Sequence, residues 1–198
     1  MNTLKLNLGC GTDIKEDHVN VDIVPVNGID LVADLSRIPY PFKDSAFDQI
    51  LIHHVLEHLP DTLAVMTELH RISKPGGEIF VAVPYWNSYG AVVDPTHKSF
   101  FHHKTFDYFD PTKALCQSKG FYTKARFQIE HIHYISELKL LKILQKLIPI
   151  KNQEGHYKIP KQVRIKNKIF KCLFETVASY FCNMINAMEI DLTTIKED

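Results

Sequence analysis

Short apolar runs recur at regular spacing through the first half of the chain. The runs are Leu4–Leu8, His18–Ile23, Asp30–Asp34, Asp48–Ile52 and Glu78–Val83. Most of them are short apolar runs, as expected for strands that are buried on both faces of a parallel sheet. We therefore expect the first half of the chain to supply the strands of a mostly parallel sheet.

A helical period lies between the last two of these runs. Asp61 is placed to cap a helix that continues to about Ile72. The apolar residues on one face of that helix are Leu63, Met66, Leu69 and Ile72. The Lys74-Pro75-Gly76-Gly77 segment then predicts the end of the helix and a turn into the next strand.

The second half of the chain predicts a further helix, then two strands around an insertion. The helix is expected from about Thr105 to Lys119, with an interruption at Asp110-Pro111 where a second piece could begin. Tyr122–Ile135 alternates as a long strand does, and Ala187–Ile195 is expected to be the last strand. Glu137–Ile148 and about Ile165–Ile185 have the spacing of amphipathic helices.

Strands that alternate with helices predict an α/β fold with a mostly parallel sheet. We expect one domain over residues 1–198, with residues 137–186 forming a helical insertion between the last two strands. The first connection departs from the usual pattern, because only ten residues separate Leu8 from Val19. A parallel crossover normally takes a dozen residues or more, so this connection has no room for a full helix.

Composition narrows the class of protein. The chain has 198 residues, of which 45% are hydrophobic and 23% are charged, as in an ordinary globular domain. It contains no run of 18 apolar residues, and its first residues show no apolar signal segment. The four cysteines lack paired metal-ligand spacing. We therefore expect a reduced, cytoplasmic protein.

Positive charge is concentrated in one block, residues 138–171, which holds ten Lys or Arg residues and one acidic residue. Its simplest interpretation is a solvated helix face packed on the domain. The alternatives are peripheral contact with an anionic membrane surface, contact with an anionic substrate such as a nucleotide-linked or lipid-linked sugar or with RNA, and a homodimer contact.

The first two strands carry the clearest candidate chemistry. Leu8-Gly9-Cys10-Gly11 is a strand that ends in Gly-x-Gly, where the missing side chains let backbone approach a ligand closely. Asp22 ends the next strand, where its carboxylate could accept from both hydroxyls of a ribose. The sequence therefore predicts a nucleoside-containing cofactor. Ile14 stands where a dinucleotide-binding turn has its third glycine, which disfavours a nicotinamide cofactor.

Six motifs in order extend this pattern. They are Leu8-Gly9-Cys10-Gly11, Val21-Asp22, Ala33-Asp34-Leu35, Phe47-Asp48-Gln49-Ile50-Leu51-Ile52, Val55-Leu56-Glu57-His58-Leu59 and Leu69-His70-Arg71-Ile72-Ser73-Lys74-Pro75-Gly76-Gly77. With these motifs the chain resembles the class I S-adenosylmethionine-dependent methyltransferases of the small-molecule type (methyltransferase type 11) over roughly residues 4–135 and again in the last strand. The resemblance implies a Rossmann-like, seven-stranded sheet whose last strand is antiparallel and lies beside the sixth.

The resemblance also implies a site for S-adenosylmethionine. Gly9 and Gly11 would let the backbone pass close to the methionine moiety. Asp22 would accept hydrogen bonds from the ribose hydroxyls, and Asp34 with Leu35 would flank the adenine. Asn7 stands where the family usually has an acid, and it can still accept from the amino group of the cofactor. The expected cofactor-binding residues are Asn7, Gly9, Cys10, Gly11, Asp22, Ile23, Asp34, Leu35 and His53.

Methyl transfer to an alcohol benefits from a general base, and histidine is the usual choice. His54 follows the fourth strand, close to the expected sulfonium. Asp94-Pro95-Thr96-His97 follows the fifth strand and resembles a segment of methyltransferases assigned to surface-polysaccharide pathways. We expect His97 to be the base or a donor to the substrate, with Asp94 orienting it, and the acceptor to be an oxygen of a small molecule or glycan.

Other interpretations of the same residues remain open. Asp94, His97, His102 and His103 could instead bind a metal ion, but adjacent residues point apart on a strand or helix, so we expect no metal. His58 is expected to be structural. The aromatic residues between Tyr85 and Phe109 could stack on a sugar or simply pack a lid.

The alternative function is a non-catalytic module of the same fold that binds an anionic partner, either a membrane surface or RNA, through the basic block. Methylation of nucleic-acid amino groups is disfavoured, because no Asp/Asn-Pro-Pro-Tyr sequence follows the fourth strand.

Overall fold

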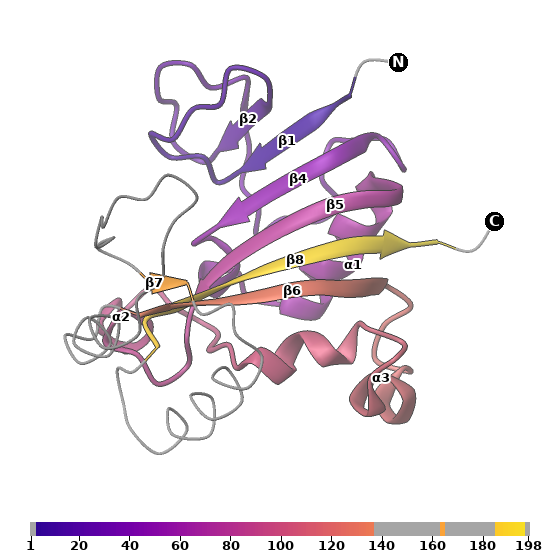
Figure 1. Ribbon diagram of the computed structural model, residues 1–198. Helices are drawn as coiled ribbons and strands as arrows, with labels where there is room; N and C mark the ends of the chain where they lie inside the picture. Colours follow the sequence, from indigo (N-terminus) through magenta and orange to yellow (C-terminus); the bar gives the residue numbers. More distant parts are fainter. Residues whose placement is uncertain (1–2, 137–162, 165–184, 197–198) are drawn as a thin grey trace, which may run out of the picture.

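The computed structural model describes residues 3–136, 163–164 and 185–196 of the chain (Figure 1). Its centre is one sheet in the order β3-β2-β1-β4-β5-β8-β6-β7. The strands are β1 (Lys5–Leu8), β2 (Val19–Asp22), β3 (Leu31–Val32), β4 (Phe47–His53), β5 (Ser73–Pro84), β6 (Arg126–Ser136), β7 (Val163–Arg164) and β8 (Ala187–Ile195). Strands β1 to β5 pair in parallel, whereas β8 runs antiparallel to both of its neighbours, β5 and β6.

The sheet confirms the α/β, Rossmann-like fold that the resemblance implied, with an antiparallel last strand placed beside the sixth. Its one addition within the described residues is β7, a two-residue strand at the edge next to β6. The predicted helix Glu137–Ile148 lies outside the described residues. So do the predicted helix Ile165–Ile185, apart from Ile185 itself, and most of the basic block. No helix in the described ranges is long and apolar enough to cross a membrane.

Helix α1 (Thr62–Ile72) confirms the helix that the apolar period predicted. The Asp61 side chain caps it by accepting from the backbone N–H of Ala64 at 2.9 Å. The helix lies behind the sheet in Figure 1, and it buries Val65, Met66, Leu69 and Ile72. These side chains join those of the inner sheet face in a single apolar core.

The helix predicted from about Thr105 to Lys119 is interrupted at Asp110-Pro111, as the sequence indicated. Its first piece is a 3-10 helix, η2 (His103–Tyr108), and its second piece is a short helix, α3 (Ala114–Lys119), which Gly120 ends. The buried Asp110 side chain is the cause of the interruption. It accepts from the N–H and hydroxyl of Thr112, which closes a local turn, and from the N–H of Ile129 on β6, which fixes that turn against the sheet.

Strand β5 also begins earlier than predicted. Ser73 already pairs with Phe47, and Glu78 pairs with Gln49, so the four residues from Lys74 to Gly77 bulge out between two ladder positions. Lys74 reaches back across this bulge to the Asp48 carboxylate at 2.7 Å.

The connection from β1 to β2 contains no helix, as its length predicted. Two buried amide side chains hold it instead. Asn7 donates to the side-chain oxygen of Asn20 at 3.1 Å and to the carbonyl of Asp13 at 2.9 Å. Asn20 in turn donates to the carbonyl of Lys15 and accepts from its N–H. These bonds satisfy backbone groups that a crossover helix would have paired internally.

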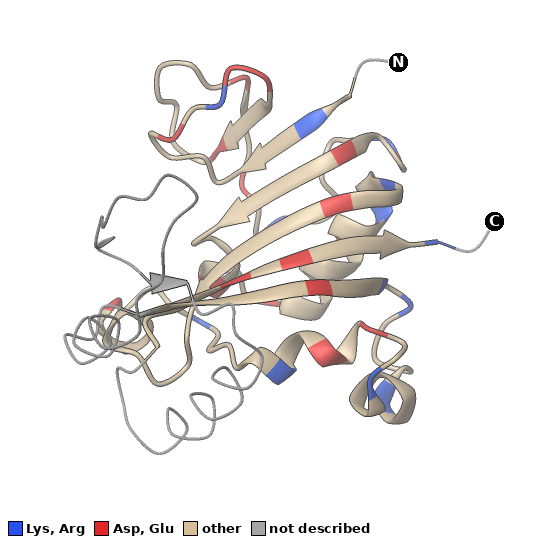
Figure 2. Cartoon of the chain, viewed as in Figure 1, with Lys and Arg blue, Asp and Glu red and all other residues tan. Residues whose placement is uncertain are grey.

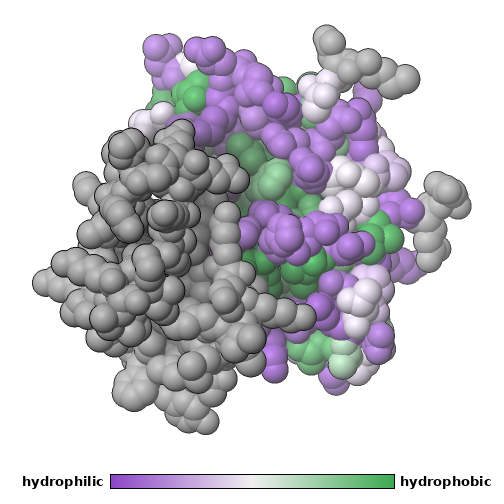
Figure 3. Space-filling view, in the orientation of Figure 1, coloured by the Kyte–Doolittle hydropathy of each residue, from purple (hydrophilic) through white to green (hydrophobic). Residues whose placement is uncertain are grey.

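The two faces of the sheet differ in character. Strand β8 shows this directly, because its residues alternate between buried and half-buried along its length. The half-buried face is turned to the viewer in Figure 2, where acidic residues are visible on β4, β5, β6 and β8. Figure 3 shows hydrophilic side chains over much of the same face, with apolar side chains visible in several places between them.

Removing the cap of α1 tests how much local sequence stabilises the fold. Asp61→Ala leaves the N–H of Ala64 without its side-chain acceptor, so we expect the free energy of unfolding to fall by about 1 kcal/mol. Asp61→Asn is the matched control, since Asn caps equally well, and it should change stability by only a few tenths. Urea unfolding followed by circular dichroism measures both. Equal losses for the two variants would contradict the assigned cap.

Candidate active site

The carboxyl ends of β1, β2, β4 and β5 meet at one edge of the sheet, where open α/β sheets bind their ligands. The Gly9–Gly11 turn follows β1, and both glycines have positive φ. Asp22 ends β2, and its carboxylate accepts from the N–H of Gly11 at 2.8 Å and from the N–H of Val24 at 3.0 Å. The carboxylate therefore fixes the turn while it remains partly exposed.

The two glycines serve different purposes. A Cβ atom at Gly9 would overlap the Cγ2 methyl of Val55, so the fold itself needs glycine there. A Cβ atom at Gly11 would meet no atom within 4 Å. Open space therefore lies directly beside the Gly11 backbone and next to the Asp22 carboxylate, as a ligand would require.

An apolar surface continues from Asp22. Ile23 is 60% exposed, and Val24 and Val32 are exposed to a similar degree. Asp34 follows at the next strand end, where its carboxylate accepts from the N–H and hydroxyl of Ser36; these bonds hold its pKa below the usual range. Leu35 is buried.

Asn7 and Cys10, also expected to bind the cofactor, are both buried. The Nδ2 of Asn7 already donates within the β1–β2 connection. Burial, together with the negative charge of Asp22, raises the pKa of the Cys10 thiol. Contact of either side chain with a cofactor stays a prediction, and the structure assigns Asn7 a second task in supporting the glycine turn.

Two histidines stand at the end of β4. His53 is exposed, yet neighbouring groups desolvate its ring enough to lower its pKa, which favours the neutral imidazole. His54 has a φ of 55°, and its N–H donates to the carbonyl of Ala82 on β5. Its Nδ1 lies 3.4 Å from the carboxylate of Glu57. The turn after β4 therefore presents one imidazole beside a buried acid.

The segment from Asp94 to Ser99 packs against the short helix η1 (Leu56–His58) that follows this turn. The carbonyl of Glu57 accepts from the N–H groups of Lys98 and Ser99. The rings of His58 and His97 lie 4.6 Å apart. The structure thus places the three expected catalytic residues, His54, Asp94 and His97, around one cluster.

Hydrogen bonds within this cluster orient its rings. The Nδ1 of His97 lies 2.9 Å from the carbonyl of Ala91, whereas its Nε2 lies 3.9 Å from Asp94, beyond hydrogen-bond length. Ala91 is therefore the group that orients His97. Asp94 accepts instead from Thr96, whose hydroxyl lies 2.9 Å from the Nδ1 of His58. The Thr96 bonds hold the pKa of Asp94 below its usual range.

Sequence reasoning missed Glu57 and Thr96 and treated His58 as structural. The available signal was an acid and a histidine directly after the fourth strand, three and four residues beyond His54. The expectation that His102 and His103 point apart is also wrong. His102 is the N-cap of η2, outside regular structure, and the two rings lie 4.0 Å apart.

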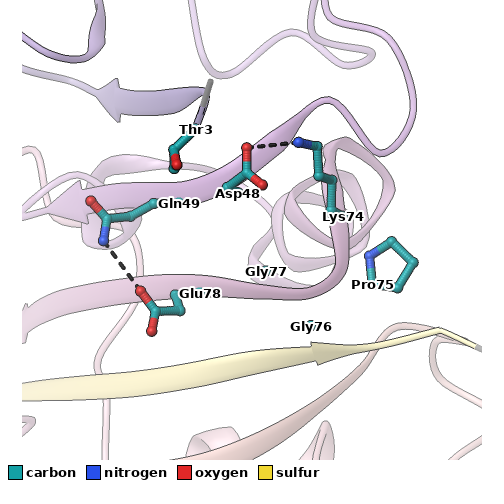
Figure 4. Close-up of a pocket in the computed structure, with 8 residues that line it drawn as sticks. All are labelled: Thr3, Asp48, Gln49, Lys74, Pro75, Gly76, Gly77 and Glu78. Carbon is teal, nitrogen blue, oxygen red and sulfur yellow. Dashed lines mark hydrogen bonds and ion pairs between the residues drawn. The ribbon is translucent and has the colours of Figure 1, made fainter. Parts of the chain in front are cut away.

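A cavity of about 270 Å³ lies at the opposite edge of the sheet (Figure 4). Lys74 and Asp48 form an ion pair at its rim, and Gln49 donates to Glu78 across it. Because the cavity lies at the amino ends of β4 and β5, it is remote from the Gly9–Gly11 turn and the histidine cluster.

Comparisons with known proteins identify a related domain in the first half of the chain. The family "Methyltransferase domain" matches residues 9–81. A demethylmenaquinone methyltransferase of Listeria welshimeri is 31% identical over 99 residues, which cover 44% of this chain and 38% of the relative. The chain thus matches well under half of the length of that curated relative.

Solved structures share the fold at low identity. A SAM-dependent methyltransferase from Archaeoglobus fulgidus aligns with a TM-score of 0.60 and 17% identity, over 96% of this chain and 86% of its own. The [4+2]-cyclase SpnF aligns with a TM-score of 0.55 and 13% identity, over 99% of this chain and 76% of its own. At such identities the likeness shows the fold alone.

Alanine substitutions at Gly9 and Gly11 should distinguish a glycine that is required for packing from one that leaves room for a ligand. Gly11→Ala has open room and a positive φ, so we expect a loss of about 1 to 2 kcal/mol in unfolding free energy. Gly9→Ala adds overlap with Val55, which should cost about 1 to 3 kcal/mol more. Chemical denaturation measures both losses. Val55→Ala introduced into Gly9→Ala should recover part of the loss, and failure to recover any would refute the overlap.

Proposed function

Because this chain carries a class I S-adenosylmethionine-dependent methyltransferase domain, we propose that it transfers the methyl group of S-adenosylmethionine to an oxygen of a small molecule or glycan. The observation that supports this proposal is that two groups of residues lie at the same edge of the sheet. There the open space at Gly11 and the Asp22 carboxylate lie on the same side as the cluster around His54 and His97.

The residues at this edge fit the cofactor. A carboxylate has about four lone-pair positions, and Asp22 uses two of them for the N–H groups of Gly11 and Val24. The remaining positions can accept from the two ribose hydroxyls. Ile23 and Val24 offer exposed apolar surface for the adenine, and Asp34 follows at the adjacent strand end. Gly11 leaves room for the methionine moiety.

S-adenosylmethionine supplies an electrophilic methyl group on a positively charged sulfur. This chain must hold the acceptor oxygen in line and take its proton. His97 donates from Nδ1 to the Ala91 carbonyl, so its Nε2 keeps a lone pair. The Nδ1 of His54 lies 3.4 Å from the Glu57 carboxylate. These two rings are the candidate bases, and Asp94 positions the cluster through Thr96.

Exposed aromatic side chains near this edge support a sugar-like acceptor. Trp86 lies two residues after the end of β5. Tyr89 begins the short helix α2 (Tyr89–Val93), and Phe100 directly precedes Phe101, which forms an isolated bridge with Tyr85. All three are exposed, and the backbone N–H of Trp86 donates to the carbonyl of Phe101. Aromatic faces of this kind stack on sugar rings, which supports a role in surface-polysaccharide synthesis.

The cofactor site has a direct test in isothermal titration calorimetry with S-adenosylmethionine. Asp22→Ala removes the acceptor for the ribose hydroxyls and loosens the Gly11 turn. Hydrogen bonds to a charged group contribute about 1.5 to 3 kcal/mol, so we expect affinity to fall roughly ten- to a hundredfold.

Glu78→Ala, at the opposite edge of the sheet, is the matched control and should bind like the unmodified protein. Circular dichroism should show the same fold in both variants. Absence of binding to the unmodified protein at millimolar cofactor, or equal affinity in Asp22→Ala, would refute the proposed site.

A further inference from the structure

General acid–base catalysis does not fully explain why the side chains of Glu57, His58 and His97 are clustered. One potential ligand atom from each residue lies within 4.8 Å of those of the other two. We propose that these three side chains bind a divalent transition-metal ion and that the ion holds the acceptor oxygen. The second half of this inference rests on the proposed methyl transfer, whereas metal binding stands on the geometry alone.

Glu57 supplies the first argument. The residue is only 1% exposed, and its Oε2 is buried without any hydrogen-bond partner in the described part of the chain. Within the described residues, its other oxygen, Oε1, has only the 3.4 Å contact with His54. A buried carboxylate that lacks partners is costly, and a bound cation removes that cost. The Glu57 backbone is also fixed, since its carbonyl accepts from Lys98 and Ser99.

The hydrogen bonds of His58 supply the second argument, because they determine its tautomer. An ionised Asp94 can only accept, so the hydroxyl of Thr96 donates its single proton to Asp94, at 2.6 Å. Thr96 must then accept from the Nδ1 of His58, which lies 2.9 Å away. This chain of bonds leaves the lone pair of His58 on Nε2.

The tautomer of His97 is determined in the same way, by the acceptor that its ring contacts. Its Nδ1 lies 2.9 Å from the carbonyl of Ala91, which can only accept, so Nδ1 carries the proton and Nε2 carries the lone pair. Both histidines therefore offer Nε2 while the other nitrogen is fixed by an acceptor. Metal-binding histidines show this arrangement, since the outer hydrogen bond sets the tautomer and the ring orientation.

Two imidazole nitrogens and one carboxylate make the ligand set of many catalytic zinc sites, which keep a position open for water or substrate. An acceptor hydroxyl in that position would have its pKa lowered by the ion and would release its proton to solvent. In this arrangement His97 acts as a ligand of the ion. The proposed ligands are therefore Glu57, His58 and His97. The sequence alone had suggested a different possible metal-binding set, which was Asp94, His97, His102 and His103.

Metal binding can be measured without any methyl acceptor. The full chain is stripped with a chelator and titrated with Zn²⁺ by calorimetry, and separately with Co²⁺, whose visible absorption reports its coordination. We expect one equivalent to bind. Glu57→Gln and His58→Ala should each weaken metal binding by roughly a hundredfold or more. Loss of a group that only orients a metal ligand weakens binding by about ten- to a hundredfold, and loss of a ligand should cost at least as much as the upper end of that range.

His131→Ala, which removes an exposed histidine on β6, is the matched control and should leave metal affinity unchanged. His97→Gln serves as a second ligand variant should either of the others fail to fold by circular dichroism. Wild-type affinity in folded ligand variants, or a Co²⁺ spectrum with thiolate absorption, would overturn the site.

Titration of S-adenosylmethionine into the same proteins separates the two proposals. Glu57→Gln should keep its cofactor affinity while it loses the metal. Cofactor binding without metal binding in the unmodified protein would refute the metal site alone. Metal binding without cofactor binding would refute the methyl-transfer proposal and leave the metal site standing.

Discussion

The proposed cofactor site, at the carboxyl ends of the parallel strands, depends on one constraint. This constraint is the ten-residue connection between β1 and β2. A crossover helix would normally set the distance between two such strands and pair the intervening backbone groups. Here the buried amides of Asn7 and Asn20 perform that task, and Asp30 accepts from the N–H of Asn20 to fix the same strand end. The result is a glycine turn that lies within hydrogen-bond distance of Asp22. An acid in place of Asn7 could not donate to Asn20, so the support of the turn explains the amide at this position.

A second backbone contact brings the rest of the site to the same edge. The carbonyl of Glu57 binds the segment that follows Asp94, and this contact seats His97 against His58. The Glu57 residue therefore has two functions in the structure: its backbone joins two loops, and its side chain places a buried negative charge between them. The glycine turn and the histidine cluster are held by different hydrogen bonds, and they meet where Gly9 lies against Val55, the residue that precedes η1.

The sequence predicted those parts of the structure whose causes are local. The helix after Asp61 follows from a cap and an apolar period within twelve residues, and β8 follows from one continuous strand pattern. The sequence also predicted the interruption at Asp110-Pro111, but not the contact that fixes it, because the Asp110 side chain binds the backbone of β6, a partner that no local pattern contains. The cluster around Glu57 was missed for the same reason, since its hydrogen-bond and ring partners are almost forty residues further along the chain.

The position of S-adenosylhomocysteine in a crystal structure of the complex is the most direct test of the proposed cofactor site. We expect the ribose hydroxyls on the Asp22 carboxylate, the adenine over Ile23 and the sulfur facing the end of β4. A product molecule bound elsewhere, for example in the cavity between Lys74 and Glu78, or bound without contact to Asp22, would contradict it.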